Sequence, residues 1–130
     1  YTFGPTSEVT GLASNYTHKI VDNVSCQDEN VIYYWRCIKK NCRSYPKCEY
    51  IGKTTQTFKR RFSDHRDYVK RGIATEPSGE HFSLNGHNVS HLKGLVLEKV
   101  KSKDPYVLKA REHMLIRNFD TFRNGLNRER

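Results

Sequence analysis

The sequence predicts a small α/β domain (an α+β arrangement) in which a three-stranded antiparallel sheet is flanked by helices. Two β-branched and aromatic runs, at residues 31–37 and 49–53, are typical of strands. An apolar run at 92–100 supplies a third strand. Segments with helical periodicity lie at 57–71, before the third strand, and at 105–119, after it. The chain has 130 residues, which is the size of one domain.

The first 29 residues are polar and rich in Ser, Thr, Gly and Asn, without a sustained hydrophobic period. Such a segment is expected to form an extended arm or linker. Ile20, Val21 and Val24 are the apolar side chains available to pin it to the domain. The folded domain is therefore expected to span residues 30–130.

The first two predicted strands form an antiparallel hairpin with a long connection. Residues 38–47 contain Lys-Lys-Asn, Arg-Ser and Pro46, which cannot continue a strand. Gly52 is expected to end the second strand. The hairpin therefore carries an unusually long loop that contains cysteines.

The first predicted helix places a histidine within its apolar stripe. Thr54 or Thr55 is its expected N-cap, and Arg61 lies on a neighbouring flank. The stripe follows the spacing i, i+4, i+7 and i+11: Phe58, Phe62, His65 and Val69. On composition alone, a core histidine with satisfied hydrogen bonds is the alternative to a functional one.

The second predicted helix places a carboxylate within its apolar stripe. Residues 72–91 before it are expected to form a loop, and Asp104 caps the helix with Pro105 at its first position. Its stripe consists of Leu108, Glu112, Leu115 and Phe119. A buried carboxylate is costly unless a cation or metal compensates it. A salt bridge with an arginine, or a helix rotated to expose Glu112, is the alternative.

The charge balance favours a polyanionic partner. The chain has 23 Lys and Arg against 14 Asp and Glu, a net charge of +9. Nucleic acid is favoured over an acidic membrane surface, and a basic surface kept for solubility is the alternative. No apolar run approaches the roughly 20 residues of a membrane span. The first residues do not resemble a signal peptide.

The four cysteines favour a metal site over disulfides. Three of them, Cys37, Cys42 and Cys48, lie within twelve residues, and histidines follow downstream. Cysteine and histidine at such spacing are typical zinc ligands.

Five motifs in this order resemble the GIY-YIG nucleases: IYY (32–34), YIG (50–52), FKRRFSDH (58–65), an acid on a late helix, and GLN (125–127). The resemblance spans about residues 30–127. The chain departs from the family pattern at Val31, where the family has glycine, and in a longer gap between the tyrosine motifs.

The resemblance implies a divalent-metal-dependent DNA endonuclease that cuts one strand at a time. Tyr50, with Tyr33 beside it, would help to activate the attacking water. Arg61 would hold the scissile phosphate, and His65 would orient groups or relay a proton. Lys53, Arg61 and the metal would lower the tyrosine pKa so that the phenol can act as a base.

Two further residues acquire roles from the same resemblance. Glu112 would bind one Mg²⁺ or Mn²⁺, hard cations that prefer oxygen ligands. Asn127 would position groups near the site, whereas its sequence context alone is equally consistent with a turn residue.

The cysteine-bearing gap resembles one branch of the family, the endonuclease domain of Penelope-like retroelements. That likeness implies structural Zn²⁺ held by Cys37, Cys42, His81 and His87. Rivals for these positions are Cys48, Cys26 and His91. It also implies a nick that primes reverse transcription at the target DNA, fusion to a reverse transcriptase, and a nuclear location. A non-catalytic zinc-containing nucleic-acid-binding module is the alternative class, and a domesticated domain kept for targeting is a third.

Overall fold

The computed structural model describes residues 8–21, 23–84 and 86–128. Its centre is a three-stranded antiparallel sheet with the strand order β4-β3-β5. The predicted α+β fold with this sheet is therefore confirmed. The strands are β3 (Val31–Cys37), β4 (Glu49–Thr54) and β5 (Leu92–Lys99).

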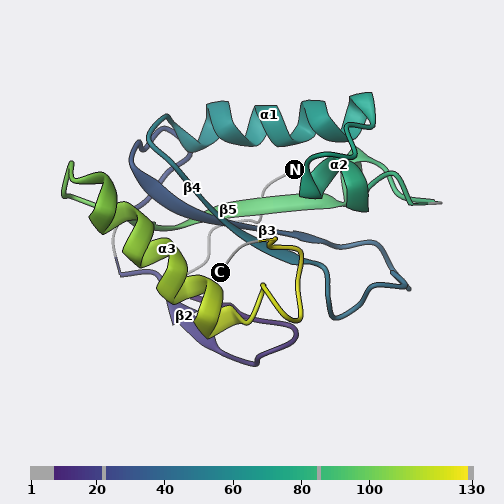
Figure 1. Ribbon diagram of the computed structural model, residues 1–130, viewed down its shortest axis with the longest axis horizontal. Coiled ribbons are helices and arrows are strands. Elements are labelled where there is room, and N and C mark those ends of the chain that lie inside the picture. The colour runs from purple at the N-terminus through teal and green to yellow at the C-terminus, as the bar shows by residue number, and fades with distance from the viewer. Residues whose placement is uncertain (1–7, 22, 85, 129–130) are drawn as a thin grey trace.

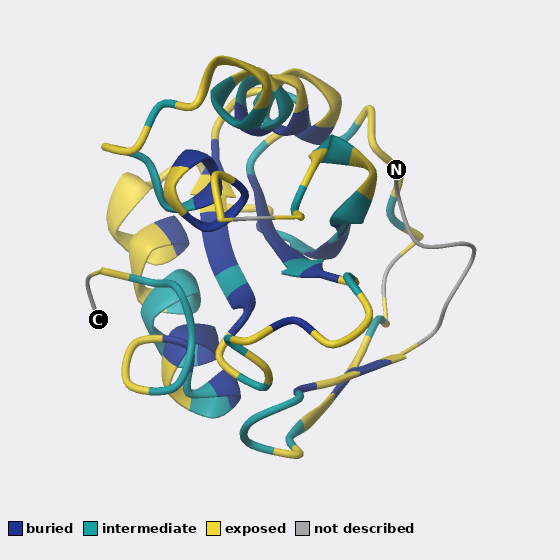
Figure 2. Ribbon diagram, turned by 90° about the vertical axis from the view of Figure 1, so that its right-hand side faces the viewer, coloured by how far each residue is buried: buried dark blue, intermediate teal, exposed yellow. Residues whose placement is uncertain are grey.

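Helices cover both faces of the sheet. α1 (Phe58–Arg71) lies on one face and α3 (Pro105–Phe119) on the other (Figure 1). Alternate side chains of the central strand β3 point to opposite faces, so Tyr33 and Trp35 pack under α1 while Tyr34 packs under α3. Figure 2 shows buried residues concentrated on the strands of this sheet. Within the described ranges, no helix combines the length and the apolar character needed to cross a membrane.

The predicted helical stripes are confirmed, with one corrected cap. Phe58, Phe62 and His65 are buried on α1, and Val69 is half-buried. Thr57 is the N-cap, because its hydroxyl accepts a hydrogen bond of 3.1 Å from the N–H of Arg60. The expectation of Thr54 or Thr55 was wrong, since β4 runs on to Thr54 itself.

The start of α3 agrees with the prediction. Asp104 caps α3 and accepts a hydrogen bond of 2.9 Å from the N–H of Tyr106, with Pro105 in the first turn. A proline tolerates this position because its missing N–H has no helical partner there. Leu108, Leu115 and Phe119 are buried along the helix.

The segment 72–91 is more regular than the predicted loop. It contains α2 (Pro77–His81) and a 3₁₀ turn, η1 (Val89–His91). Pro77 favours the helix start because its φ is already helical. Gly79 allows α2 to approach the preceding turn: a Cβ atom at this position would lie 2.0 Å from the carbonyl oxygen of Ile73.

The segment predicted to be an extended arm contains a β-hairpin. β1 (Glu8–Thr10) pairs with β2 (Thr17–Lys19), and the hairpin packs on the α3 side of the domain (Figure 1). Its buried residue His18 lies 3.1 Å, through Nε2, from the carbonyl oxygen of Leu97. Ile20 and Val24 also pack against the core, as expected, whereas Val21 is exposed.

Glu49 joins the hairpin to the sheet. Its carboxylate is buried and accepts hydrogen bonds from the N–H groups of Leu12 (3.0 Å) and Ala13 (3.5 Å). The hydroxyl of Tyr34 donates to the other carboxylate oxygen. Burial raises the pKa of Glu49, while these hydrogen bonds oppose the rise. One side chain therefore satisfies donors from the hairpin loop and from β3.

Removal of this carboxylate should release the hairpin. Glu49→Ala leaves buried donors without an acceptor, each costing about 1–3 kcal/mol. We expect urea denaturation to show a loss of at least about 2 kcal/mol, and hydrogen exchange to be faster at Leu12. Glu29→Ala, at an exposed carboxylate, is the control and should change stability by less than about 0.5 kcal/mol. Equal stability of the two variants would contradict this role.

Candidate functional site

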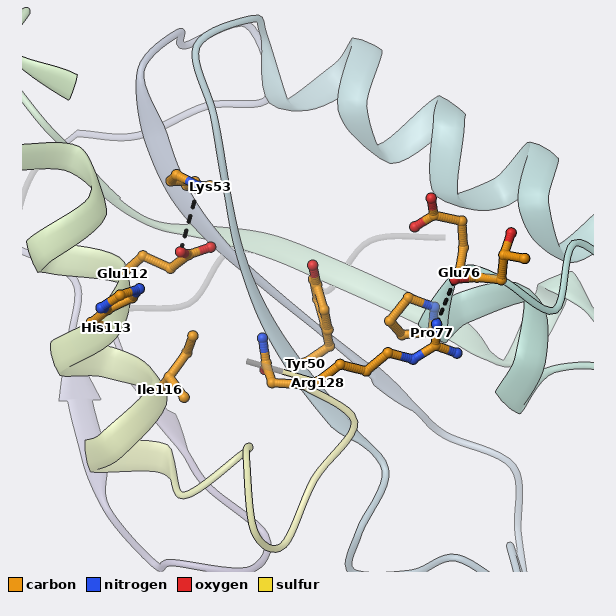
Figure 3. A pocket seen from close by; sticks show the side chains of 10 residues that line it. Tyr50, Lys53, Glu76, Pro77, Glu112, His113, Ile116 and Arg128 are labelled. Carbon is orange, nitrogen blue, oxygen red and sulfur yellow. Dashed lines mark hydrogen bonds and ion pairs between the residues drawn. The ribbon is translucent and has the colours of Figure 1, made fainter. Parts of the chain in front are cut away.

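A pocket of about 290 Å³ lies along the free edge of β4, between α3 and α2 (Figure 3). Residues from the strand, both helices and the C-terminal segment form its walls. They are Tyr50, Lys53, Thr75, Glu76, Pro77, Glu112, His113, Ile116, Asn127 and Arg128.

The strand register brings the two predicted tyrosines together. Tyr33 lies opposite Gly52, and Trp35 lies opposite Tyr50, on the face covered by α1. Gly52 is required here: a Cβ atom would come within 2.4 Å of the Tyr33 ring and its hydroxyl. Because β4 continues to Thr54, Gly52 lies inside the strand and does not end it, contrary to the sequence prediction.

Buried hydrogen bonds connect Tyr33 to α1 and α2. The Tyr33 hydroxyl lies 2.6 Å from Nε2 of His65 and accepts a bond of 3.3 Å from Nε of Arg61. Nδ1 of His65 lies 3.1 Å from the hydroxyl of Ser78. The histidine in the apolar stripe therefore has a partner on each ring nitrogen.

Burial dominates the protonation of this network. It lowers the pKa of His65 to about 3, with a smaller effect from the charge of Arg61, so the imidazole is neutral at pH 7. Burial also raises the pKa of Tyr33 and of Tyr50, and the carboxylate of Glu112 adds to the rise at Tyr50. Arg61 acts in the predicted, lowering direction, but burial outweighs it.

Glu112 reaches the pocket from α3. Its side chain is 13% exposed and pairs with the ammonium of Lys53 at 3.7 Å. The salt bridge weighed as an alternative thus exists, with a lysine as the partner. Figure 3 shows Glu112 and Glu76 on opposite sides of the pocket with the Tyr50 phenol between them.

Arg61 and Asn127 take different places around this pocket. Arg61 contacts Tyr33 and pairs with Asp64 at 3.6 Å, and it does not line the pocket. Asn127 exchanges two hydrogen bonds with the backbone of Ile51, of 2.9 and 2.8 Å. It therefore covers part of the β4 edge and is more than a turn residue.

Sequence reasoning missed several residues of this region. Glu76, His113 and Arg128 line the pocket, and Arg128 also pairs with Glu80 at 3.2 Å. Ser78 supports His65 from α2. None of these residues interrupts a predicted hydrophobic period, so the sequence pattern carries no signal for them.

A second site is formed by four cysteine and histidine side chains. The ligand atoms of Cys37, Cys42, His81 and His87 all lie within 4.8 Å of one another. Sγ of Cys42 is 3.7 Å from Nε2 of His81 and 3.4 Å from Nε2 of His87. Tetrahedral zinc requires sulfur and nitrogen ligands about 3.6 Å apart. The predicted set therefore could hold a metal ion such as zinc.

The rival ligands have other contacts. Cys26 is exposed, and Sγ of Cys48 lies 3.8 Å from the carbonyl oxygen of Cys37. Nδ1 of His91 accepts a hydrogen bond of 3.1 Å from the N–H of Asn88 within η1. All four cysteines are free thiols.

The protonation states of the cysteine and histidine side chains in this cluster depend on whether a metal ion is bound. Burial lowers the pKa of His81 to about 4, which keeps the imidazole available as a ligand. Burial raises the pKa of Cys37 to about 11, so its thiolate needs a neighbouring cation. A bound zinc ion would supply that charge, since a coordinating thiol is deprotonated.

Comparisons of this chain with protein-family models, curated proteins and solved structures give no match. Any functional assignment therefore depends on the motifs of this chain and on the geometry of its two sites.

The Cys/His cluster predicts about one bound zinc per chain. Cys42→Ser should abolish stoichiometric binding, because it removes a ligand from a closed four-ligand site. Zinc content by mass spectrometry and the thiolate-to-metal absorption of the cobalt form measure this. Cys48→Ser and Cys26→Ser are matched controls and should retain the metal. Loss of zinc from either control, with retention in Cys42→Ser, would overturn the ligand set.

The low pKa of His65 predicts an acid-dependent loss of stability. Between its usual pKa of about 6.5 and the folded value of about 3, the unfolded chain binds an extra proton. The unfolding free energy of the wild type relative to His65→Gln should therefore fall by about 1.4 kcal/mol per pH unit below about 6.5. Urea titrations at several pH values measure this difference, and a constant difference would contradict the buried neutral state.

Proposed function

We propose that the domain is a divalent-metal-dependent DNA endonuclease of the GIY-YIG type that cuts one strand at a time. The observation that carries the proposal is the pocket in which Glu112, Lys53 and Tyr50 face the same space. A buried network of Tyr33, His65 and Arg61 lies behind it. Phosphodiester cleavage needs a base, charge neutralisation and fixed geometry, and these groups offer all three.

Glu112 is the candidate ligand for Mg²⁺ or Mn²⁺. Mg²⁺ is commonly bound through one or two carboxylates, with water and phosphate completing the shell, so one carboxylate facing an open pocket fits the ion. When bound, the ion would neutralise phosphate charge. It would also offset the negative charge by which Glu112 raises the pKa of Tyr50.

The resemblance to the GIY-YIG nucleases suggests roles for the other side chains. Tyr50 would act in its phenolate form: its own proton would first pass to solvent through the pocket, and the phenolate oxygen would then take a proton from the attacking water. Lys53 places positive charge beside the phosphate. Arg61, whose side chain is 27% exposed, exchanges Asp64 for a phosphate oxygen. Asn127 holds the edge of β4 in place beneath the substrate.

The resemblance to the endonuclease domain of Penelope-like retroelements extends the proposal. The nick would prime reverse transcription, with a reverse transcriptase fused to this domain, and the protein would act in the nucleus. The net charge of +9 suits a DNA substrate, since phosphate contacts supply most non-specific affinity.

A zinc-containing nucleic-acid-binding module is the second candidate. It is favoured by the loop 38–47 beside the Cys/His cluster, which carries Lys39, Lys40, Arg43 and Lys47 and no acidic residue. A pure binder, however, has no use for a carboxylate in the pocket, so Glu112 separates the two functions.

Cleavage of supercoiled plasmid with Mg²⁺ or Mn²⁺ tests the proposal. The wild type should produce open circles, and Glu112→Ala should reduce the rate at least about 100-fold, because the metal-binding carboxylate is lost. Asp67→Ala is the control, since it removes an exposed carboxylate of α1 that pairs with Arg71. Its rate should equal that of the wild type.

The two candidate functions give different results in this assay. If neither the wild type nor Glu112→Ala cuts, while both are folded, zinc-loaded and able to retard DNA in a gel, the endonuclease is rejected. The binding module then stands.

A further inference from the structure

Ser78 is a buried hydroxyl that no motif predicted. It lies on α2, and the described residues give its hydroxyl one side-chain partner, Nδ1 of His65 at 3.1 Å. His65 lies in turn 2.6 Å from the hydroxyl of Tyr33. Ser78, His65 and Tyr33 are all fully buried, so water does not replace a lost partner easily.

The direction of these hydrogen bonds follows from counting protons. A neutral imidazole carries one N–H, so it donates on one side and accepts on the other. If Ser78 accepted from His65, the serine proton would be buried without an acceptor among the described residues, at a cost of about 1–3 kcal/mol. Ser78 therefore donates to Nδ1, and His65 carries its proton on Nε2 and donates to Tyr33.

The direction of the hydrogen bond between His65 and Tyr33 determines which group can accept the hydroxyl proton of Tyr33. Arg61 can only donate, so the phenol oxygen of Tyr33 accepts from both Arg61 and His65. Its own proton remains for Tyr50, since the ring centroids of the two tyrosines lie 6.2 Å apart. Burial raises the pKa of Tyr50, and the hydroxyl of Tyr33 opposes that rise. A donor at this place favours the ionised form of Tyr50.

The same short helix joins this chain of hydrogen bonds to the Cys/His cluster. His81, one turn after Ser78, supplies a candidate metal ligand. Gly79 packs closely on Ile73 and fixes the position of α2. Two contacts therefore determine the position of Ser78: the packing of Gly79 on Ile73 and the place of His81 in the Cys/His cluster.

We infer that Ser78 is a positioning residue that fixes the Nε2–H tautomer of His65 and so directs the hydrogen bond of Tyr33 toward Tyr50. This inference rests on the proposed nuclease function, because the direction matters only if Tyr50 accepts a proton. Ser78 acts through His65 and does not touch the substrate.

Nitrogen NMR of His65 in the zinc-loaded protein tests the tautomer directly. Long-range ¹⁵N–¹H spectra distinguish a protonated from an unprotonated ring nitrogen. We expect protonated Nε2 and unprotonated Nδ1 in the wild type. In Ser78→Ala, the Nδ1 resonance should move to the position of a nitrogen that accepts no hydrogen bond. Protonated Nδ1 in the wild type would overturn the inference.

Cleavage rates provide the second readout. Loss of one positioning hydrogen bond should slow plasmid nicking by up to about tenfold. Ser83→Ala is the matched control, because Ser83 is exposed and donates only to the carbonyl oxygen of Glu80. Both variants should keep their zinc. Equal rates of the two variants would overturn the positioning role even if the tautomer is as expected.

Failure of this inference is distinguishable from failure of the proposed function. A wild type that cuts DNA but has protonated Nδ1 refutes the role of Ser78 alone. A wild type that does not cut refutes the nuclease, and with it the catalytic meaning of Ser78, whatever the tautomer.

Discussion

The close packing of the Tyr33 ring over Gly52 is the constraint on which the site depends. Any side chain at position 52 would occupy the space of the phenol. The ring in turn carries the hydroxyl to Arg61 and His65 of α1. The register of β3 against β4, the docking of α1 and the geometry of the buried network are therefore linked through one contact.

The histidine and tyrosines of the interior are neutral, whereas the polar groups of the pocket include an ion pair. Beneath α1, burial keeps His65 and the tyrosines neutral, and their polar atoms are satisfied by one another. At the β4 edge, Glu112 and Lys53 pair with each other at 3.7 Å and both line the pocket. In the proposed phosphodiester cleavage, fixed dipoles would lie behind the reacting groups and charged side chains would face the phosphate.

Residue propensity predicted the strands, and helical periodicity predicted both long helices and the two polar residues in apolar stripes, because each is a local pattern. The four candidate metal ligands also followed from spacing and resemblance. The N-terminal hairpin did not, because its docking depends on Glu49, which lies 37 residues from its partner Leu12. The contact of Ser78 with His65 could not be predicted either, since only the folding of α2 against α1 brings the two residues together.

Asn127 has a consequence beyond the shape of the pocket. β4 is an outer strand, and an uncovered outer strand can pair with another copy of the chain and start aggregation. By bonding to both backbone groups of Ile51, Asn127 occupies part of that edge at the wall of the pocket. The residue that lines the pocket thereby also covers part of an edge through which the sheet could pair with another copy of the chain.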